Sequence, residues 1–168
     1  MDRNKKFIGA IFALVVLLIF NLCSYTPFTV NTSPSVTKGI YFVVPKMFAR
    51  EYEKDDMVIF NPPVDVKAFM VERGYVMPKD SLLKEIKALE NDRFTVDDRF
   101  IQINGKYAGT ISTIDSRGRE IKPFYGDHTV EEGYFLPMGT AVNSYDGRYF
   151  GCVSLKSIKN KVILLIKF

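Results

Sequence analysis

The sequence contains very little histidine and cysteine. Among its 168 residues there is one histidine, His128, and there are two cysteines, Cys23 and Cys152. Because Cys23 lies at the end of an apolar run, the two cysteines predict no disulfide framework. Two cysteines and one histidine cannot form a zinc site made only of protein ligands. We therefore expect neither a metal ion nor another cofactor.

The single histidine also argues against one class of hydrolase. His128 lies in the polar segment 125–130, YGDHTV, which we interpret as a surface turn. A Ser-His-Asp hydrolase would have to be built on that turn. Carboxylates are paired at 55–56, 97–98 and 131–132, and we interpret them as solvated strand ends and turns. A glycosidase or a metal site built from these carboxylates is therefore not expected.

The chain also lacks a strong excess of charge. Its formal net charge is +4, and part of this comes from Arg3, Lys5 and Lys6 near the N-terminus. In the rest of the chain both signs are interspersed, so there is no basic surface of the kind that nucleic-acid binding requires. There are no repeats, and the length suits one domain after any membrane segment.

A long apolar run lies near the start of the sequence. Residues 7–23 carry no charged side chain. A helix over residues 7–25 would be about 28 Å long, close to the roughly 30 Å thickness of the hydrocarbon core. The positive side chains precede this run, so the N-terminus is predicted to be cytoplasmic and the following domain periplasmic, at a bacterial inner membrane.

We interpret this run as an uncleaved anchor. No small-x-small cleavage site follows it, as a secretory signal peptide would need, and Phe20, Asn21 and Leu22 are a poor setting for lipidation of Cys23. We therefore predict four parts: a cytoplasmic N-terminus (1–6), an anchor (7–25), a linker (26–32) and a periplasmic domain (33–168).

Beyond the anchor, short apolar and β-branched runs alternate with turn residues. These runs are 39–44, 56–63, 94–96, 100–105, 107–113, 133–140, 148–155 and 161–168. This pattern predicts a mainly β domain, either a folded sheet or a partly closed barrel. Asn104-Gly105 predicts a hairpin, because this pair suits turns that need positive φ. The segment 115–120, DSRGRE, predicts a second turn.

Residues 80–93, DSLLKEIKALENDR, have an ambiguous pattern. Four apolar residues match one helical stripe, and these are Leu82, Leu83, Ile86 and Leu89. As a strand, the segment would instead place Lys84 on one face with Ile86 and Ala88. On pattern alone the helix is favoured.

A serine and a lysine offer catalytic chemistry that does not need histidine. A serine nucleophile requires a base, and a lysine can serve if burial lowers its pKa toward neutrality. Ser35, in the segment SPS after the anchor, and Lys84, among apolar neighbours, form a candidate dyad. This signal is weak alone, since the chain has many serines and lysines.

Several segments together resemble a known family. These are SPSVTKGIY, DDMVIFNPP, ERGYV, LLKEIKALENDRF, INGK, DSRGREI and NSYDGRYFG. Over about residues 31–153, their order and spacing resemble those of type I signal peptidases, in particular the short conjugative-transfer signal peptidases of TraF type. That resemblance implies a signal-peptidase-like β domain behind one N-terminal transmembrane helix.

The resemblance assigns roles to individual residues. It implies that Ser35 is the nucleophile and Lys84 the general base, which makes residues 80–93 a strand and overrides the helical pattern. It also implies that the Ser33 hydroxyl helps to form the oxyanion hole with the Ser35 N–H. Ser144 would orient the base.

The same resemblance implies that Asp146 and Arg148 brace the region around the orienting serine. Two departures from the family pattern have structural consequences. Glu85 stands where many relatives have arginine, and as a strand residue it would lie on the face opposite the base. Asn91 stands in place of a glycine, and asparagine tolerates the left-handed conformation.

The implied function is leader-peptide removal by a membrane-anchored Ser/Lys endopeptidase. The expected substrate is an exported precursor, chiefly a conjugative pilin precursor, and the sequence does not decide between hydrolysis and pilin cyclisation. Channel proteins of the conjugation system are further candidate partners. The alternatives are a housekeeping signal peptidase and a non-catalytic part of a conjugation or secretion channel. The apolar residues near the site are interpreted either as core or as an edge that meets the membrane, and they are Val36, Phe42, Val43 and Met47.

Overall fold

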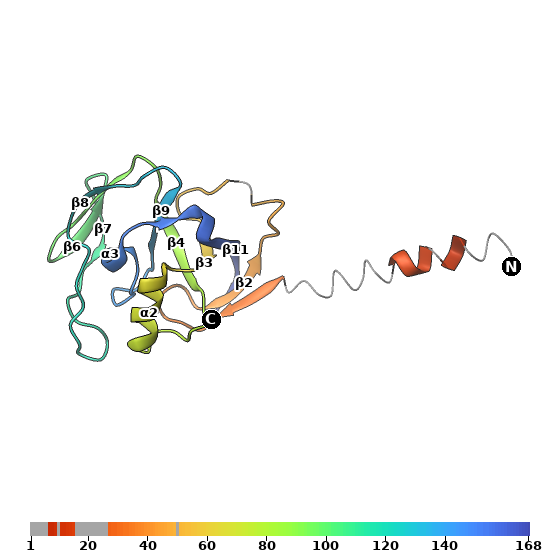
Figure 1. Ribbon diagram of the computed structural model, residues 1–168, viewed down its shortest axis with the longest axis horizontal. Coiled ribbons are helices and arrows are strands. Elements are labelled where there is room, and N and C mark those ends of the chain that lie inside the picture. The colour runs from red at the N-terminus through yellow and green to blue at the C-terminus, as the bar shows by residue number, and fades with distance from the viewer. Residues whose placement is uncertain (1–6, 10, 16–26, 50) are drawn as a thin grey trace.

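A computed structural model of the chain describes residues 7–9, 11–15, 27–49 and 51–168 (Figure 1). Within these ranges, no helix is long and apolar enough to cross a membrane. The predicted cytoplasmic segment 1–6 and most of the predicted anchor 7–25 lie outside the described residues.

The described residues form two antiparallel sheets (Figure 1). The seven-stranded sheet contains, in spatial order, β1 (Phe28–Asn31), β2 (Gly39–Val43), β11 (Ile158–Lys167), β3 (Met57–Phe60), β4 (Leu82–Ala88), β9 (Tyr134–Met138) and β10 (Val153–Ser154). The four-stranded sheet contains β7 (Lys106–Thr110), β6 (Phe100–Ile103), β5 (Arg93–Val96) and β8 (Gly126–Thr129). The domain is mainly β, as predicted, and both sheets are open rather than closed into a barrel.

Strand β4 connects the two hydrophobic cores. Leu82 and Ile86 lie in the first core, which packs against helix α2 (Val64–Glu72), while Ala88 lies in the second core beneath the small sheet. Burial alternates along β4, with every second residue from Leu82 to Ala88 buried. The strand implied by the family resemblance is therefore confirmed, and the helical pattern of residues 80–93 is misleading.

Two short helical segments follow β9. Helix α3 (Gly147–Phe150) begins after Asp146, whose side chain accepts a hydrogen bond from the Arg148 amide and caps the helix. The 3-10 helix η1 (Leu155–Ser157) lies between β10 and β11. The predicted strand over 148–155 is therefore wrong in its first half, which is helical.

The predicted linker 26–32 contains a strand. Residues of β1 pair with β2, with Phe28 opposite Phe42 and Asn31 opposite Gly39. Because β1 extends the large sheet, the folded domain begins before residue 33. The polar residues and the proline of this segment are typical of a connection, and they led to the linker prediction.

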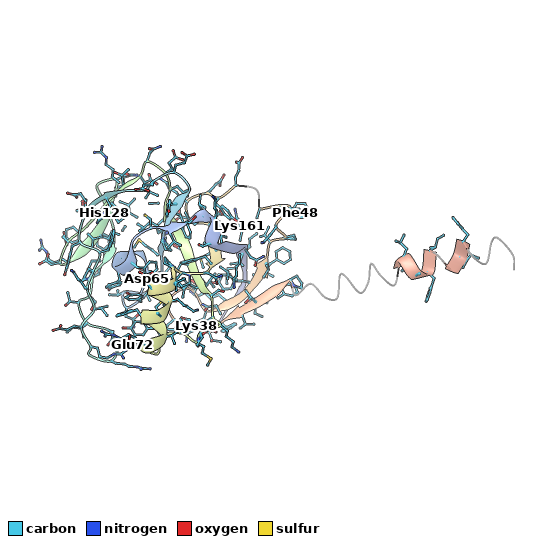
Figure 2. The ribbon with its side chains drawn as sticks, in the orientation of Figure 1. Lys38, Phe48, Asp65, Glu72, His128 and Lys161 are labelled. Carbon is cyan, nitrogen blue, oxygen red and sulfur yellow. The ribbon has the colours of Figure 1, made fainter. Side chains whose placement is uncertain are left out.

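The predicted turn at His128 is also wrong. His128 lies in β8 opposite Phe94, and its ring stacks on Phe94 and Phe124 with centroid separations of 5.0 and 4.3 Å. Figure 2 shows His128 well apart from Lys38, which is three residues from Ser35. The histidine is thus part of the small sheet.

The expected local turns are present. The hairpin between β6 and β7 has positive φ at Asn104 (49°) and Gly105 (74°). Asn91 has φ 67°, as its place in the family pattern predicts. These asparagines allow sharp reversals between strands.

Candidate active site

The loop that carries Ser35 joins β1 to β2 and is organised by Asn31. The Asn31 side-chain amide donates hydrogen bonds to the backbone carbonyls of Ser33 (3.0 Å), Val36 (3.3 Å) and Thr37 (3.0 Å). Its Oδ1 accepts from the Ser33 amide at 3.1 Å. One largely buried side chain therefore fixes the loop from both sides of the serine.

Ser33 and Ser35 lie against each other in this loop. Their Oγ atoms are 3.1 Å apart, and the Ser35 N–H donates to the Ser33 Oγ at 3.3 Å. Ser33 is exposed and Ser35 is half-buried. The two groups that were predicted to meet an oxyanion are thus adjacent.

Lys84 is a buried cation in the middle of β4. Only 3% of the residue is exposed, and its Nζ donates to the Ser144 Oγ at 2.8 Å. Burial lowers the pKa of Lys84 to about 8, while the charge of Asp146 acts to raise it and that of Arg148 to lower it. A substantial fraction of this lysine is therefore neutral in mildly alkaline solution.

Asp146 and Arg148 form a buried ion pair behind Ser144. The Arg148 Nη2 lies 2.9 Å from the Asp146 Oδ2, and their side chains are 2% and 0% exposed. The guanidinium also donates to the carbonyls of Ala141 (2.7 Å), Val142 (3.2 Å) and Ser144 (3.2 Å). The pair therefore holds the backbone that carries Ser144.

The Ser35 loop and the Ser144 loop make direct contact at Gly139. The Ala141 amide donates to the Ser35 carbonyl at 3.3 Å, and the Gly139 amide donates to Asp146 at 2.8 Å. A Cβ at Gly139 would overlap both the Ser35 carbonyl and the Ser144 Oγ. Glycine at this position therefore lets the two loops approach each other.

These elements surround one open cleft of about 730 Å³. Its walls come from residues 29–35, 74–76, 80–84, 115–117 and 143–145, together with Met70, Ile59 and Ile121. Four of the six predicted site residues, Ser33, Ser35, Lys84 and Ser144, line it. Asp146 and Arg148 lie behind the wall. Among the described residues, no hydrogen bond links the Ser35 hydroxyl to Lys84.

Three other titratable groups, one in the cleft and two outside it, are unsuited to act as the base or nucleophile. Burial, reinforced by Tyr75, raises the pKa of Tyr145 to about 12. Burial also raises the pKa of Cys152 to about 12, so its thiol stays protonated near neutral pH. Glu85 pairs with Lys87 at 2.6 Å on the face of β4 opposite Lys84, as predicted. Lys84 remains the cleft group with a pKa moved toward neutrality.

Sequence reasoning missed two positioning residues, Asn31 and Gly139. An asparagine near a Ser-Pro-Ser segment is a signal for side-chain-to-backbone bonding in a turn, and this signal could have identified Asn31. Gly139 follows a strand, and the sequence around it indicates a glycine in a turn and nothing more. Its role depends on a contact with Ser35, more than a hundred residues earlier in the chain.

Comparison with known proteins places this architecture in a family. The chain is 34% identical over 135 residues to the conjugal transfer protein TraF of Agrobacterium fabrum, covering 74% of this chain and 73% of the relative. It is 28% identical over 176 aligned positions to the plasmid transfer protein TraF of Escherichia coli, covering 96% and 97%.

A solved structure and a family model complete the comparison. The crystal structure of a signal peptidase I from Enterococcus faecalis matches with a TM-score of 0.40 and 20% identity, over 70% of this chain and 98% of that one. The model for the signal peptidases of peptidase family S26 matches residues 3–166. This chain therefore belongs to the S26 signal peptidases, a family of serine peptidases.

Proposed function

We propose that the chain is a leader peptidase in which Ser35 is the nucleophile and Lys84 the general base. The observation that carries this proposal is the buried lysine, whose pKa is lowered to about 8 in the same cleft as Ser35. A lysine that loses its proton this readily can accept one from a serine hydroxyl.

The proposed reaction proceeds through an acyl-enzyme. Neutral Lys84 accepts the Ser35 hydroxyl proton as the Oγ attacks the scissile carbonyl, and the resulting lysine ammonium then donates a proton to the leaving amine. Water, deprotonated by the same lysine, releases the acyl group. In enzymes without substrate, the hydrogen bonds between catalytic groups are often long or poorly aligned. The hydrogen bond between the Ser35 hydroxyl and the Lys84 Nζ would therefore form when the precursor binds.

Two donors are available for the oxyanion. The Ser35 N–H, which now makes a 3.3 Å bond to the Ser33 Oγ, would donate to the oxyanion, and the Ser33 hydroxyl would supply a second bond. A single such donor typically contributes about 3 to 4 kcal/mol to lowering the barrier. Ser144, fixed by the brace behind it, would hold the Lys84 Nζ in position.

The precursor is proposed to bind as an added strand. Strand β3 pairs with Leu82–Glu85, whereas β9 pairs with β4 only from Glu85 onward. Residues 82–84 therefore have one edge without a neighbouring strand, and this segment lines the same cleft as residues 29–33. An extended peptide between these two walls would satisfy the open backbone groups.

An apolar sheet face supports attachment to a membrane. The registers of β1, β2 and β11 place two rows of side chains on one face, namely Phe28, Phe42 and Ile163, and Val30, Ile40 and Ile166. Phe28, Val30, Ile163 and Ile166 are each more than half exposed. Monomeric soluble proteins seldom expose a patch of this kind, so we place this face at the periplasmic surface of the inner membrane, next to the predicted anchor 7–25.

The four apolar residues near Ser35 that were interpreted as core or as membrane-facing differ in their exposure. Val36 is 2% exposed and belongs to the core, whereas Met47 is 68% exposed. Phe42 and Val43 are half-buried. Phe48, at the outer edge of the domain in Figure 2, is exposed beside Met47 and could extend the membrane-facing surface.

The membrane placement predicts a difference between two spin labels. In the full chain with Cys23 and Cys152 changed to serine and reconstituted in vesicles, a label at Ile166, on the apolar face, should be shielded from a water-soluble relaxing agent. A label at Tyr107, which is also more than half exposed but lies on the small sheet, should be accessible. Equal accessibility of the two labels would contradict this placement.

The names of the two relatives, which refer to conjugal and plasmid transfer, favour a pilin precursor as the substrate. Proteins of the conjugation channel would then be its neighbours in the membrane. Substrate breadth separates this proposal from a housekeeping role: deletion should stop pilus formation and leave the maturation of other exported proteins intact.

Ser35→Ala is expected to abolish pilin maturation. Cells with this variant should accumulate the full-length precursor, because the chain loses its nucleophile. Ser116→Ala, which removes a hydroxyl at the other end of the same cleft, should process normally. Mass spectrometry of the pilin provides the measurement and also distinguishes a linear product from a ring. Normal processing by Ser35→Ala would refute the proposed function.

A further inference from the structure

The end of the cleft near α2 carries positive charge that the proposed chemistry does not use. There the turn 115–119 packs against Arg73, the residue that follows α2. The Arg73 carbonyl accepts hydrogen bonds from the Arg119 Nη2 (2.9 Å) and the Arg117 Nη1 (3.3 Å). The Arg73 guanidinium donates to the Glu120 carbonyl at 3.0 Å. The turn and the end of the helix thus form one connected unit.

Asp115 organises this turn through the hydrogen bonds that its carboxylate accepts. Its carboxylate accepts from the backbone amides of Arg117 (2.8 Å) and Arg119 (2.9 Å), from the Arg119 Nε (2.8 Å) and from the Tyr75 hydroxyl (2.7 Å). Burial acts to raise the pKa of Asp115, but these hydrogen bonds together hold it well below its ordinary value. Asp115 is therefore ionised and committed to the turn.

Arg117 is the cation that this arrangement leaves available. It is exposed and lines the cleft beside Ser116. A guanidinium has five N–H donors, and the hydrogen bond that the structure gives this one is to the Arg73 carbonyl. Within the described part of the chain, Asp115 forms ion pairs with Arg73 and Arg119, and Arg117 has no carboxylate partner.

The remaining carboxylate that lines the cleft does not neutralise Arg117. Asp80 lies on the β4 side, where its Oδ2 accepts from the Met77 amide at 2.8 Å. Asp115 is therefore paired with the guanidinium groups of Arg73 and Arg119, and the Arg117 guanidinium lines the cleft without a carboxylate partner among the described residues. A planar guanidinium held in this way is suited to bind a carboxylate through two parallel hydrogen bonds.

We propose that Arg117 binds a Glu or Asp side chain of the precursor and so sets a charge preference at a distance from the cut. This inference rests on the proposed peptidase function. The acidic residue could lie in the leader or in the mature part of the precursor. In either case Arg117 acts in substrate binding and takes no part in the chemistry at Ser35.

The test uses the full chain in detergent with synthetic peptides spanning the cut site of the pilin precursor. A single Glu is moved along both sides of the cut, and each Glu peptide has a Gln twin. At one position the Glu peptide should be cleaved with a kcat/KM about two- to fivefold higher, as expected for a partly exposed ion pair. The difference should appear in KM and shrink at high salt.

Variants separate a direct contact from a structural effect. Arg117→Gln should cleave both twins alike, and Arg117→Lys should keep part of the preference. Arg99→Gln, at an exposed arginine just before β6, should keep all of it. The subsite is overturned if the wild-type chain cleaves every Glu and Gln pair equally or if Arg117→Gln retains the preference. Failure of the wild-type chain to cleave any peptide would overturn the proposed function and this subsite with it.

Discussion

Lys84→Met is expected to lower kcat/KM for precursor cleavage by about 10²- to 10⁴-fold, the range typical for loss of a general base. Methionine has a similar length and is apolar, so it can occupy the space between Leu82 and Ile86 without accepting a proton. The measurement is the rate of peptide cleavage by the purified full chain. Cleavage at the wild-type rate would remove lysine from the mechanism.

The pH dependence of the wild-type chain follows from the same group. Because the neutral amine is the active form, kcat/KM should rise as the pH increases through about 8 and level off above it. The residual activity of Lys84→Met should lack this rise.

The same substitution is expected to make the fold more stable. The folded-state pKa of Lys84 is about 8 against an ordinary 10.5, so between these pH values the unfolded chain binds more protons. The free energy of unfolding of the wild-type chain should therefore increase with pH in that window. Below it, the buried ammonium costs about 3 kcal/mol. Lys84→Met should raise the free energy of unfolding by this amount, less about 1 kcal/mol for the lost hydrogen bond to Ser144.

Lys87→Met is the matched control for both effects. Lys87 lies on the same strand, but it faces the other side and pairs with Asp55 and Glu85 at 2.6 Å. The Lys87→Met variant should cleave the precursor at the wild-type rate, and its kcat/KM should keep the wild-type dependence on pH. Urea unfolding of each variant separates loss of the base from misfolding: a Lys84→Met chain less stable than the wild type at neutral pH would contradict the account of the buried lysine.

Asp146→Ala is expected to lower the free energy of unfolding by about 3 to 5 kcal/mol. It leaves the Arg148 guanidinium buried without its counter-charge, which is among the most costly single changes in a protein. It also removes the acceptor for the Gly139 amide. The measurement is urea unfolding of the full chain in detergent, followed by near-ultraviolet circular dichroism.

A double substitution and a surface pair provide the controls. Asp146→Ala with Arg148→Met should be more stable than Asp146→Ala alone, because the unpaired charge is removed. Asp98→Ala, which breaks a 4.0 Å contact between side chains about 80% exposed, should change stability by less than about 1 kcal/mol. An Asp146→Ala chain as stable as Asp98→Ala would show that the buried pair does not brace the site.

The sequence indicates the candidate site residues and the elements that carry them to different degrees. Ser35 and Lys84 were identified through the order of several short motifs, and the structure places both in one cleft. The strand around Lys84 is hard to recognise because Leu83, on the face opposite the lysine, is also half-buried, and Leu89, just after β4, packs against the first core. Burial on both faces of β4 imitates a helical stripe.

Other elements were missed for different physical reasons. Helix α2 has no strong apolar face, since Val64 is 87% exposed while Met70 is buried, so its periodicity is weak. Strand β1 is stabilised by pairing with β2, and a pairing partner cannot be read from four residues. The contact of Gly139 with Ser35 likewise depends on the tertiary fold.

The hydrogen bonds of Asn31 determine where conformational entropy is lost. Fixing one residue costs about 1 to 2 kcal/mol, and in the Ser35 loop this loss occurs when the chain folds, before any precursor arrives. The ordering cost at binding then falls mainly on the precursor. Precursors that are already extended near the cut would bind with the smallest loss, so the stiffness of the substrate contributes to its selection along with its side chains.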